Sequence, residues 1–323
     1  ELVAATMNSN WGGRDHGAVE VERVVIDWVR RVAGWPEGTS GIVTSGTSQA
    51  TLLALSVARV KRFGVSLRQS GIKALPDIRV YAAEGAHSCL GKALEVMGHG
   101  RAALVSVPVD MAGQMDMSAL RAAVAADRAQ GIVPLAIVAT AGSVNTGVFD
   151  PVSQIADFCA QENIWLHIDG AFGFWTRLAD EPWRSLSDGV ERADSIACDF
   201  HKWMFVPYAC GACLIRDQAA HRATFAERPS YLAAQDQGLG GGDWWYCDYG
   251  LELSRGFNAL KIWAAIKAHG ARTFGMVISD NCRQAQRMGE MVAKTRGMRL
   301  AFPVTSNVCC IALETADAEA IAA

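Results

Sequence analysis

The sequence predicts an α/β fold in which a mainly parallel sheet is flanked by helices. Short apolar runs without strict polar alternation recur along the middle of the chain, as is typical of strands that are buried on both faces. Segments with helical spacing separate these runs, so strands and helices alternate. With 323 residues, half of them hydrophobic, the chain is long enough for a large core in one or two domains.

The elements of the expected sheet follow one another from residue 77 onward. The strands are expected at 77–83, 102–109, 133–142, 164–171, 195–200 and 212–217. The helices are expected from about Ser48 and at 87–98, 117–131 and 151–163. Ser118 is the expected cap of the helix at 117–131, and Gly131 its end.

The pattern changes after Asp217. Residues 218–248 have weak periodicity and many glycines, which indicates a helix and then a long loop. Helices are then expected at about 254–269 and 273–294, followed by strands at 298–302 and 307–314. The predicted divisions are a connecting segment (1–35), a large domain (36–255) and the start of a small C-terminal α/β domain (256–323).

Composition excludes several classes of protein. The formal net charge is −3 and there is no basic block, so nothing favours nucleic acid or an anionic membrane as a partner. No apolar run approaches the roughly 20 residues that cross a bilayer, and the first residues lack the layout of a signal peptide. The nine cysteines have no small-scaffold spacing, so we expect reduced thiols in a cytoplasmic protein.

A glycine-containing turn runs into a helix in the stretch TSGTSQATLLALSVAR, residues 44–59. The free N–H groups and the dipole of a helix N-terminus favour an anion, and Thr47 and Ser48 add hydroxyl donors. The same residues suit an ordinary Ser/Thr helix cap, and the pattern is not a Walker phosphate loop.

Two further residues stand where ligands of parallel sheets bind, beyond the carboxyl ends of strands. Asp169 ends the run IWLHID, and a buried carboxylate there needs a partner, which an arginine or a helix cap also satisfies. Lys202 lies between apolar runs, where desolvation disfavours the ammonium and a neutral amine is a nucleophile toward carbonyls. A lysine that extends to solvent at a strand end is the alternative.

An anion site, a carboxylate and a lysine together match what pyridoxal 5'-phosphate (PLP) needs. Its phosphate suits a helix N-terminus, its aldehyde reacts with a lysine, and its ring nitrogen stays protonated beside an acid. His87, in the segment AEGAHSCLGKAL, is a candidate to stack on the ring.

Five segments carry a resemblance to a known family. They are TSGTSQATLLAL, AHSCLGKA, HIDGAFG, DFHKWMFVPYACG and SRGFNALKIW. In this order and at about this spacing, the chain resembles the group II PLP-dependent decarboxylases, which include the aromatic-L-amino-acid decarboxylases and have the aspartate-aminotransferase-like fold (PLP fold type I). The resemblance covers nearly the whole chain.

The resemblance assigns roles around the cofactor ring. It implies that Lys202 forms a Schiff base with PLP and that Asp169 pairs with the pyridine nitrogen. It also implies that Ala171 lies against the ring and that His87 stacks on the other face. Val144 stands where some branches carry a cofactor-contacting threonine, so no cofactor role is expected there.

The resemblance also assigns the phosphate site. It implies that Thr47 and Ser48 hold the phosphate, with help from Asp199 and His201. Many relatives carry asparagine in the place of Asp199, and a carboxylate near a phosphate is repulsive unless it turns away or caps another group.

The family uses a tyrosine on a mobile loop to reprotonate the substrate carbon. Tyr231, in ERPSYLAA, is the candidate, with an ordinary loop aromatic as the alternative. The resemblance further implies a homodimer with the active site at the subunit interface. Family members extend further at both ends, so we expect a fragment or an ordered part of a longer chain.

The expected reaction is decarboxylation of an L-amino acid to the amine and CO2, through the Lys202 Schiff base and a quinonoid. An aromatic substrate is favoured over glutamate, aspartate or diaminobutyrate, and Trp244 and Trp245 either line an aromatic site or belong to an interface. The alternatives are another PLP reaction (transamination, lyase chemistry or aldehyde synthesis) and a catalytically silent homologue.

Two cysteine pairs do not add to this chemistry. Cys210 and Cys213 have redox or zinc spacing, but they lie on a predicted buried strand and no second ligand pair follows. We therefore expect core thiols and no metal site. Cys309 and Cys310 are likewise expected in the core of a strand.

Overall fold

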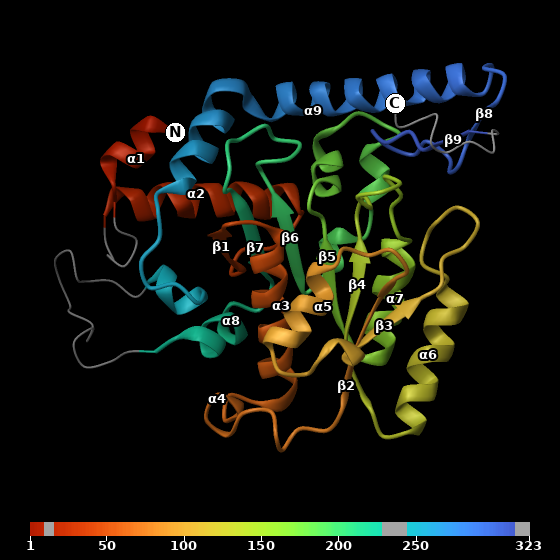
Figure 1. The fold of residues 1–323 in the computed structure, drawn as a ribbon. Helices are drawn as coiled ribbons and strands as arrows, with labels where there is room; N and C mark the ends of the chain where they lie inside the picture. Colours follow the sequence, from red (N-terminus) through yellow and green to blue (C-terminus); the bar gives the residue numbers. More distant parts are fainter. Residues whose placement is uncertain (10–15, 228–243, 314–323) are drawn as a thin grey trace.

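The computed structural model describes residues 1–9, 16–227 and 244–313 (Figure 1). In this part of the chain, seven strands form one sheet in the order β1-β7-β6-β5-β4-β2-β3, and β8 pairs with β9. The strands are β1 (Ser40–Thr44), β2 (Ile78–Ala83), β3 (Leu104–Val107), β4 (Val133–Thr140), β5 (Trp165–Asp169), β6 (Ser195–Asp199), β7 (Gly211–Ile215), β8 (Met298–Leu300) and β9 (Ile311–Leu313).

The large sheet is parallel except for one strand. β3, β2, β4, β5 and β6 pair in parallel, whereas β7 is antiparallel to both of its neighbours, β6 and β1. β1 therefore runs in the same direction as the parallel strands, and all of their carboxyl ends reach the same edge of the sheet. The predicted mainly parallel sheet is confirmed, although β1 is absent from the strands that the sequence predicts.

Helices surround this sheet (Figure 1). They are α1 (Leu2–Met7), α2 (Gly17–Val32), α3 (Thr47–Phe63), α4 (Leu67–Ser70), α5 (Cys89–Val96), α6 (Met117–Ala129), α7 (Val152–Glu162), α8 (Gln218–Phe225) and α9 (Asn258–Val292). α3 contacts five strands and packs against α5, while α2 contacts β1 and β7, and α9 runs along α2. The predicted α/β fold is thus confirmed.

Side chains of the central strands point alternately to the two faces of the sheet, so the hydrophobic core lies on both faces. On β4, Ala136 and Val138 pack in one apolar cluster with residues of α5. Ile137 and Ala139, which point the other way, pack in a second cluster with residues of α6 and α7. Because neighbouring side chains of a strand face opposite sides, the same strand buries both sets. This explains the continuous apolar runs in the sequence.

β1 is an edge strand, and two charged side chains complete its hydrogen bonding. Val43 donates its N–H to Glu22 Oε1 at 2.8 Å, and its carbonyl accepts from Arg255 Nη1 at 2.8 Å. Glu22 belongs to α2 and Arg255 lies just before α9, and the two form a buried ion pair at 3.2 Å. Burial raises the pKa of the Glu22 carboxyl, and the charge of Arg255 opposes that shift. The pair therefore joins α2 and the start of α9 to one strand.

The start of α6 differs from the expectation. The helix begins at Met117, and Asp116 caps it by accepting the N–H groups of Ser118 and Ala119 at 2.7 and 3.1 Å. Ser118, the expected cap, therefore lies within the first turn. A carboxylate also interacts favourably with the helix dipole, which explains why aspartate holds this position.

The two cysteine pairs have different environments. Cys210, directly before β7, and Cys213, in the middle of β7, are fully buried, as expected for core thiols. Cys309 and Cys310, however, are only half-buried and precede β9, so their expected place in a strand core is wrong. The Cys310 thiol lies 3.0 Å from the carbonyl oxygen of Asn145.

Helices begin the described chain and precede its last two strands, β8 and β9. α1 and α2 lie in the region expected as a connecting segment. α9 bends at Gly270, where φ is 75° and ψ is 157°, and this bend separates the two helices expected at about 254–269 and 273–294. The domain boundaries at 35/36 and 255/256 stay a prediction.

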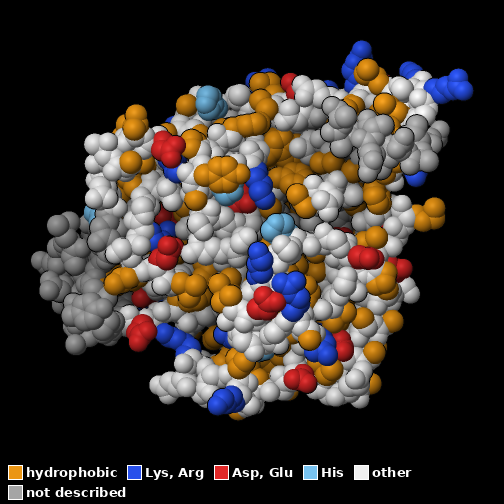
Figure 2. Space-filling view, in the orientation of Figure 1, with side chains coloured by type: hydrophobic (Ala, Val, Ile, Leu, Met, Phe, Trp, Pro, Cys, Tyr) orange, Lys and Arg blue, Asp and Glu red, His pale blue; other side chains and the backbone are white. Residues whose placement is uncertain are grey.

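The surface carries charges of both signs. Acidic and basic side chains are interspersed on the face shown in Figure 2, in keeping with a formal net charge of −3. Within the described residues, no helix is both long enough and apolar enough to span a membrane.

The buried ion pair gives a stability prediction. Arg255→Met leaves Glu22 as a buried charge without its cation, so we expect the free energy of unfolding to fall by roughly 3–5 kcal/mol in urea titrations. Arg101→Met removes an exposed ion pair with Glu95 and serves as the control, with an expected change below about 1 kcal/mol. Similar losses in both variants would contradict the assignment.

Candidate active site

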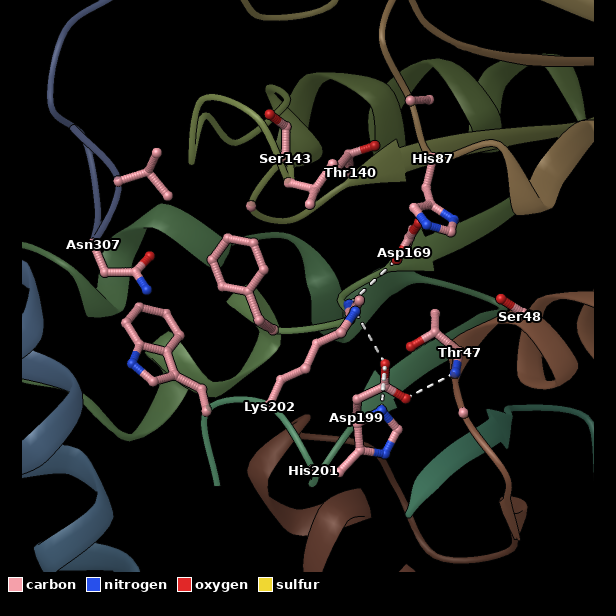
Figure 3. A pocket seen from close by; sticks show the side chains of 18 of the residues that line it. Thr47, Ser48, His87, Thr140, Ser143, Asp169, Asp199, His201, Lys202 and Asn307 are labelled. Carbon is pink, nitrogen blue, oxygen red and sulfur yellow. Dashed lines mark hydrogen bonds and ion pairs between the residues drawn. The ribbon is translucent and has the colours of Figure 1, made fainter. Parts of the chain in front are cut away.

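A pocket opens at the sheet edge where the carboxyl ends of the strands meet (Figure 3). Its volume is about 780 Å³. Its walls come from the β1–α3 turn, the β2–α5 turn, the ends of β4, β5 and β6, the connection between β6 and β7, α9, and the segment before β9. Distant parts of the sequence thus form one cavity at the position where parallel α/β sheets bind ligands.

The N-terminus of α3 forms one wall. Gly46 stands at the N-cap position and has no side chain that could cap the helix. Thr47 and Ser48, which follow it, line the pocket. The hydroxyl oxygen of Thr47 is buried without a hydrogen-bond partner among the described residues. An unpaired buried hydroxyl is unfavourable, so its position fits contact with a polar ligand group. The arrangement suits the expected anion site better than an ordinary Ser/Thr cap.

Asp169 ends β5 beneath the pocket. It is 4% exposed, and its Oδ1 accepts the N–H of Ala171 at 3.2 Å. Burial raises the pKa of this carboxyl, whereas the Ala171 N–H and the charge of Lys202 oppose the shift. No described residue forms an ion pair with Asp169, so the alternative of an arginine partner does not hold there. A buried carboxylate in this position is suited to pair with a protonated ring nitrogen, which would supply the opposite charge.

Lys202 lies in the connection between β6 and β7 and extends into the pocket (Figure 3). Trp203 and Met204, which follow it, are buried, whereas Phe205 is 61% exposed and the Lys202 side chain is 41% exposed. Its neighbours therefore enclose the amine only in part, and the expected desolvation of Lys202 stays a prediction. Its Nζ lies 3.1 Å from Asp199 Oδ2, and that ion pair holds it in place.

Asp199 caps the helix that opens the pocket. It is 2% exposed, and its Oδ1 accepts the backbone N–H of Thr47 at 2.7 Å. Its Oδ2 faces Lys202 at 3.1 Å and His201 Nε2 at 3.5 Å (Figure 3). The carboxylate does not turn away from the expected phosphate site. It caps α3, which is the second of the two possibilities that the sequence leaves open.

Two histidines line the pocket from different sides. His201 accepts the N–H of Cys210 through Nδ1 at 3.0 Å, and its ring lies 4.2 Å from that of Tyr208. Burial lowers the pKa of His201, while the charge of Asp199 raises it. His87 follows β2, and its Nδ1 accepts the N–H of Cys89 at 3.2 Å. An accepting Nδ1 requires a neutral ring with its proton on Nε2.

Several lining residues are absent from the sequence prediction. They are Thr140, Phe172, Trp203, Phe205, Tyr208, Asn281 and Asn307. The rings of Phe172 and Trp203 meet at 5.4 Å and 64°, and Trp203 donates to Asn281 Oδ1 at 2.9 Å. The aromatic run directly after Lys202 was a local signal for three of them. The two asparagines have no such signal, because they come from α9 and from the segment before β9.

Other sequence candidates lie elsewhere. Trp245 is 1% exposed, and Trp244 stacks on Tyr249 at 4.5 Å. Neither tryptophan lines the pocket, so the structure does not support the first of the two alternatives, an aromatic site, at this pocket. Val144 does line it, with 62% exposure. Tyr231 lies outside the described residues.

The pocket therefore brings together Lys202, Asp169, His87 and the start of α3, in the combination that the sequence predicts. A family model for the pyridoxal-dependent decarboxylase conserved domain matches residues 1–313.

The chain belongs to the pyridoxal-dependent decarboxylase family.

Curated members of this family resemble the chain over most of its length. An aromatic-L-amino-acid decarboxylase of Bacillus atrophaeus is 31% identical over 292 residues, which are 90% of this chain and 59% of that protein. An L-2,4-diaminobutyrate decarboxylase of Acinetobacter baumannii is 31% identical over 313 residues, 93% of this chain and 61% of that protein. The chain thus spans less than two thirds of the length of either relative.

Solved structures of similar proteins share the fold. The apo form of mouse CSAD superimposes with a TM-score of 0.89 at 25% identity, over 98% of this chain and 67% of that one. Oryza sativa TDC with PLP and tryptamine gives a TM-score of 0.87 at 27% identity, over 97% of this chain and 65% of that one. The predicted PLP fold type I architecture is confirmed.

The environment of His201 gives a titration prediction. Because burial disfavours the imidazolium, we expect the ring to titrate below its usual pKa of about 6.5. Asp199→Asn removes the nearby charge that favours the imidazolium, so the midpoint should fall further. Long-range proton–nitrogen NMR spectra of histidine-labelled protein report both midpoints and the Nε2–H tautomer. A higher midpoint in the Asn variant would contradict this account.

Proposed function

We propose that the protein is a PLP-dependent decarboxylase that converts an L-amino acid to the amine and CO2. The observation that carries the proposal is the convergence of Lys202, Asp169 and the start of α3 in one pocket of a chain from this family. These three features suit the aldehyde, the ring nitrogen and the phosphate of PLP.

At one end of the pocket, Thr47 and Ser48 would bind the phosphate. The unpaired Thr47 hydroxyl supports this placement, as do the partial positive charge and N–H groups of the α3 N-terminus. Asp199 and His201 lie beside this end, and their hydrogen bonds hold the surrounding backbone in place.

In the middle of the pocket, Lys202 would supply the primary amine and Asp169 would pair with the protonated ring nitrogen. Bound PLP supplies an electron sink for the electron pair that the departing CO2 leaves behind. His87 and Ala171 would flank the ring from opposite sides and orient it. The burial of Asp169 without an ion-pair partner among the described residues supports its role, because a protonated ring nitrogen would supply the missing positive charge.

The proton returned to the substrate carbon is proposed to come from Tyr231. The support is the position of ERPSYLAA after Lys202 in the sequence. Water exclusion around the reacting carbon would suppress side reactions.

An aromatic L-amino acid is the proposed substrate class. Phe172, Trp203, Phe205 and Tyr208 supply apolar surface in the pocket. Among the described residues that line it, Lys202 is the only lysine or arginine, so no second cation is present there to pair with an acidic side chain. Relatives at 30–31% identity act on aromatic, diaminobutyrate and cysteine sulfinic acid substrates, so a direct assay has to decide.

A homodimer with the pocket near the subunit interface is also proposed. Val144, Phe205 and Tyr208 are 62%, 61% and 72% exposed around the pocket, and apolar groups of this size are commonly covered by a partner. Light scattering after size-exclusion chromatography gives the mass that tests this proposal.

A product assay tests the reaction and its alternatives. The cofactor-loaded protein is incubated with each proteinogenic L-amino acid, and with diaminobutyrate and cysteine sulfinate. We expect an aromatic substrate to give equal amounts of CO2 and amine, as identified by mass spectrometry. A keto acid would indicate transamination, an aldehyde would indicate oxidative chemistry, and failure to bind PLP would indicate a silent homologue.

The role of Lys202 has a separate test. Lys202→Ala should abolish the visible absorbance that PLP gains on reaction with a protein amine, because the pocket then lacks that amine. Lys92→Ala changes an exposed lysine of α5 outside the pocket and should leave the absorbance unchanged. Retained colour in the Lys202 variant would remove Lys202 from the mechanism.

A further inference from the structure

The Asp199 carboxylate occupies the place where an anionic ligand of α3 would bind. Its Oδ1 already accepts the N–H of Thr47 at 2.7 Å, at the positive end of the helix dipole. The side chain is almost completely buried and has little freedom to leave. A Cβ atom at Gly211 would lie 2.7 Å from this Oδ1 and 2.6 Å from the Cα of Gly46, so backbone encloses the carboxylate tightly.

A second observation is consistent with a polar ligand at the same turn. The Thr47 side-chain oxygen is buried without a partner among the described residues, and the residue is only 6% exposed. Thr47 therefore presents its N–H to Asp199 and leaves its hydroxyl for another group. A phosphate that binds this hydroxyl and the remaining N–H groups of the first turn meets a fixed negative charge.

The surroundings compensate this charge only in part. Lys202 and His201 face the carboxylate at 3.1 and 3.5 Å. Burial, however, lowers the pKa of His201 and favours its neutral form. Lys202 is also the amine that PLP requires, so the cation that pairs with Asp199 is the same group that would react with the cofactor. Asp169, from β5, adds a second carboxyl nearby.

We propose that Asp199 sets the affinity for PLP by competing with the cofactor phosphate for the N-terminus of α3. This inference rests on the proposed function. Repulsion between two anions in a partly buried site corresponds to roughly ten- to a hundredfold in affinity. The phosphate therefore contributes less binding free energy in this protein than it would at the same helix N-terminus without the charge of Asp199.

The test separates the phosphate from the rest of the cofactor. Asparagine at position 199 keeps an oxygen for the Thr47 N–H but removes the charge. Dissociation constants of PLP and of pyridoxal, which lacks the phosphate, are measured for the wild type and for Asp199→Asn by tryptophan fluorescence quenching. We expect the substitution to tighten PLP binding at least about tenfold more than pyridoxal binding.

The comparison of ligands removes the contribution of Lys202. Loss of its ion pair affects PLP and pyridoxal alike, so it cancels in the ratio. Asp116→Asn, which changes the carboxylate cap of α6 instead, is the matched control and should alter both constants less than about twofold.

Three outcomes would overturn the inference. Equal changes for both ligands would place the effect on Lys202, and weaker PLP binding in Asp199→Asn would make Asp199 a favourable phosphate partner. If the variant does not fold, the two dissociation constants of the wild type serve as the test. PLP binding far tighter than pyridoxal binding would then contradict competition between Asp199 and the phosphate. Absence of binding for both ligands in every protein would instead overturn the proposed function.

Discussion

A single hydrogen bond, from the backbone N–H of Thr47 to the carboxylate of Asp199, joins two segments that are 152 residues apart. Thr47 begins the helix after β1, and Asp199 ends β6. The bond spans the position of β7, which lies between these strands in the sheet. Because β7 is antiparallel to both neighbours, the carboxyl ends of β1 and β6 are at the same edge, and the two segments are in reach of one another. Lys202 and His201 follow Asp199 directly, so their positions depend on the same contact.

The sequence predicts the parts of this arrangement that are local. Asp169 ends an apolar run that is a strand, and the turn before Thr47 runs into a long helix, so both are visible as patterns. The exposure of Lys202 is not visible in the same way. Trp203 and Met204 directly after it are buried, but Lys202 lies in a connection rather than in a strand, and only the tertiary structure shows that it faces a cavity.

Other parts of the fold and the site could not be predicted, because they depend on contacts between distant residues. Arg255 stands in a recognisable segment, yet its role requires Glu22 and Val43, which are more than 200 residues away. Asn281 and Asn307 reach the pocket from a long helix and from an irregular segment. The cap of α6 is Asp116 rather than the expected Ser118, two residues further on, because the side chain of Asp116 accepts the N–H groups of the first turn.

The ion pair at the edge of β1 has a consequence for assembly. An edge strand with free N–H and C=O groups is a template on which a second chain can add a strand. At Val43 both groups are engaged by Glu22 and Arg255, and the space beside Gly41 is taken by Ile26 of α2. The sheet is therefore closed to extension on this side. Association of two copies at this edge therefore has to use side-chain surfaces, which permit a defined stoichiometry, rather than continuous backbone pairing, which does not.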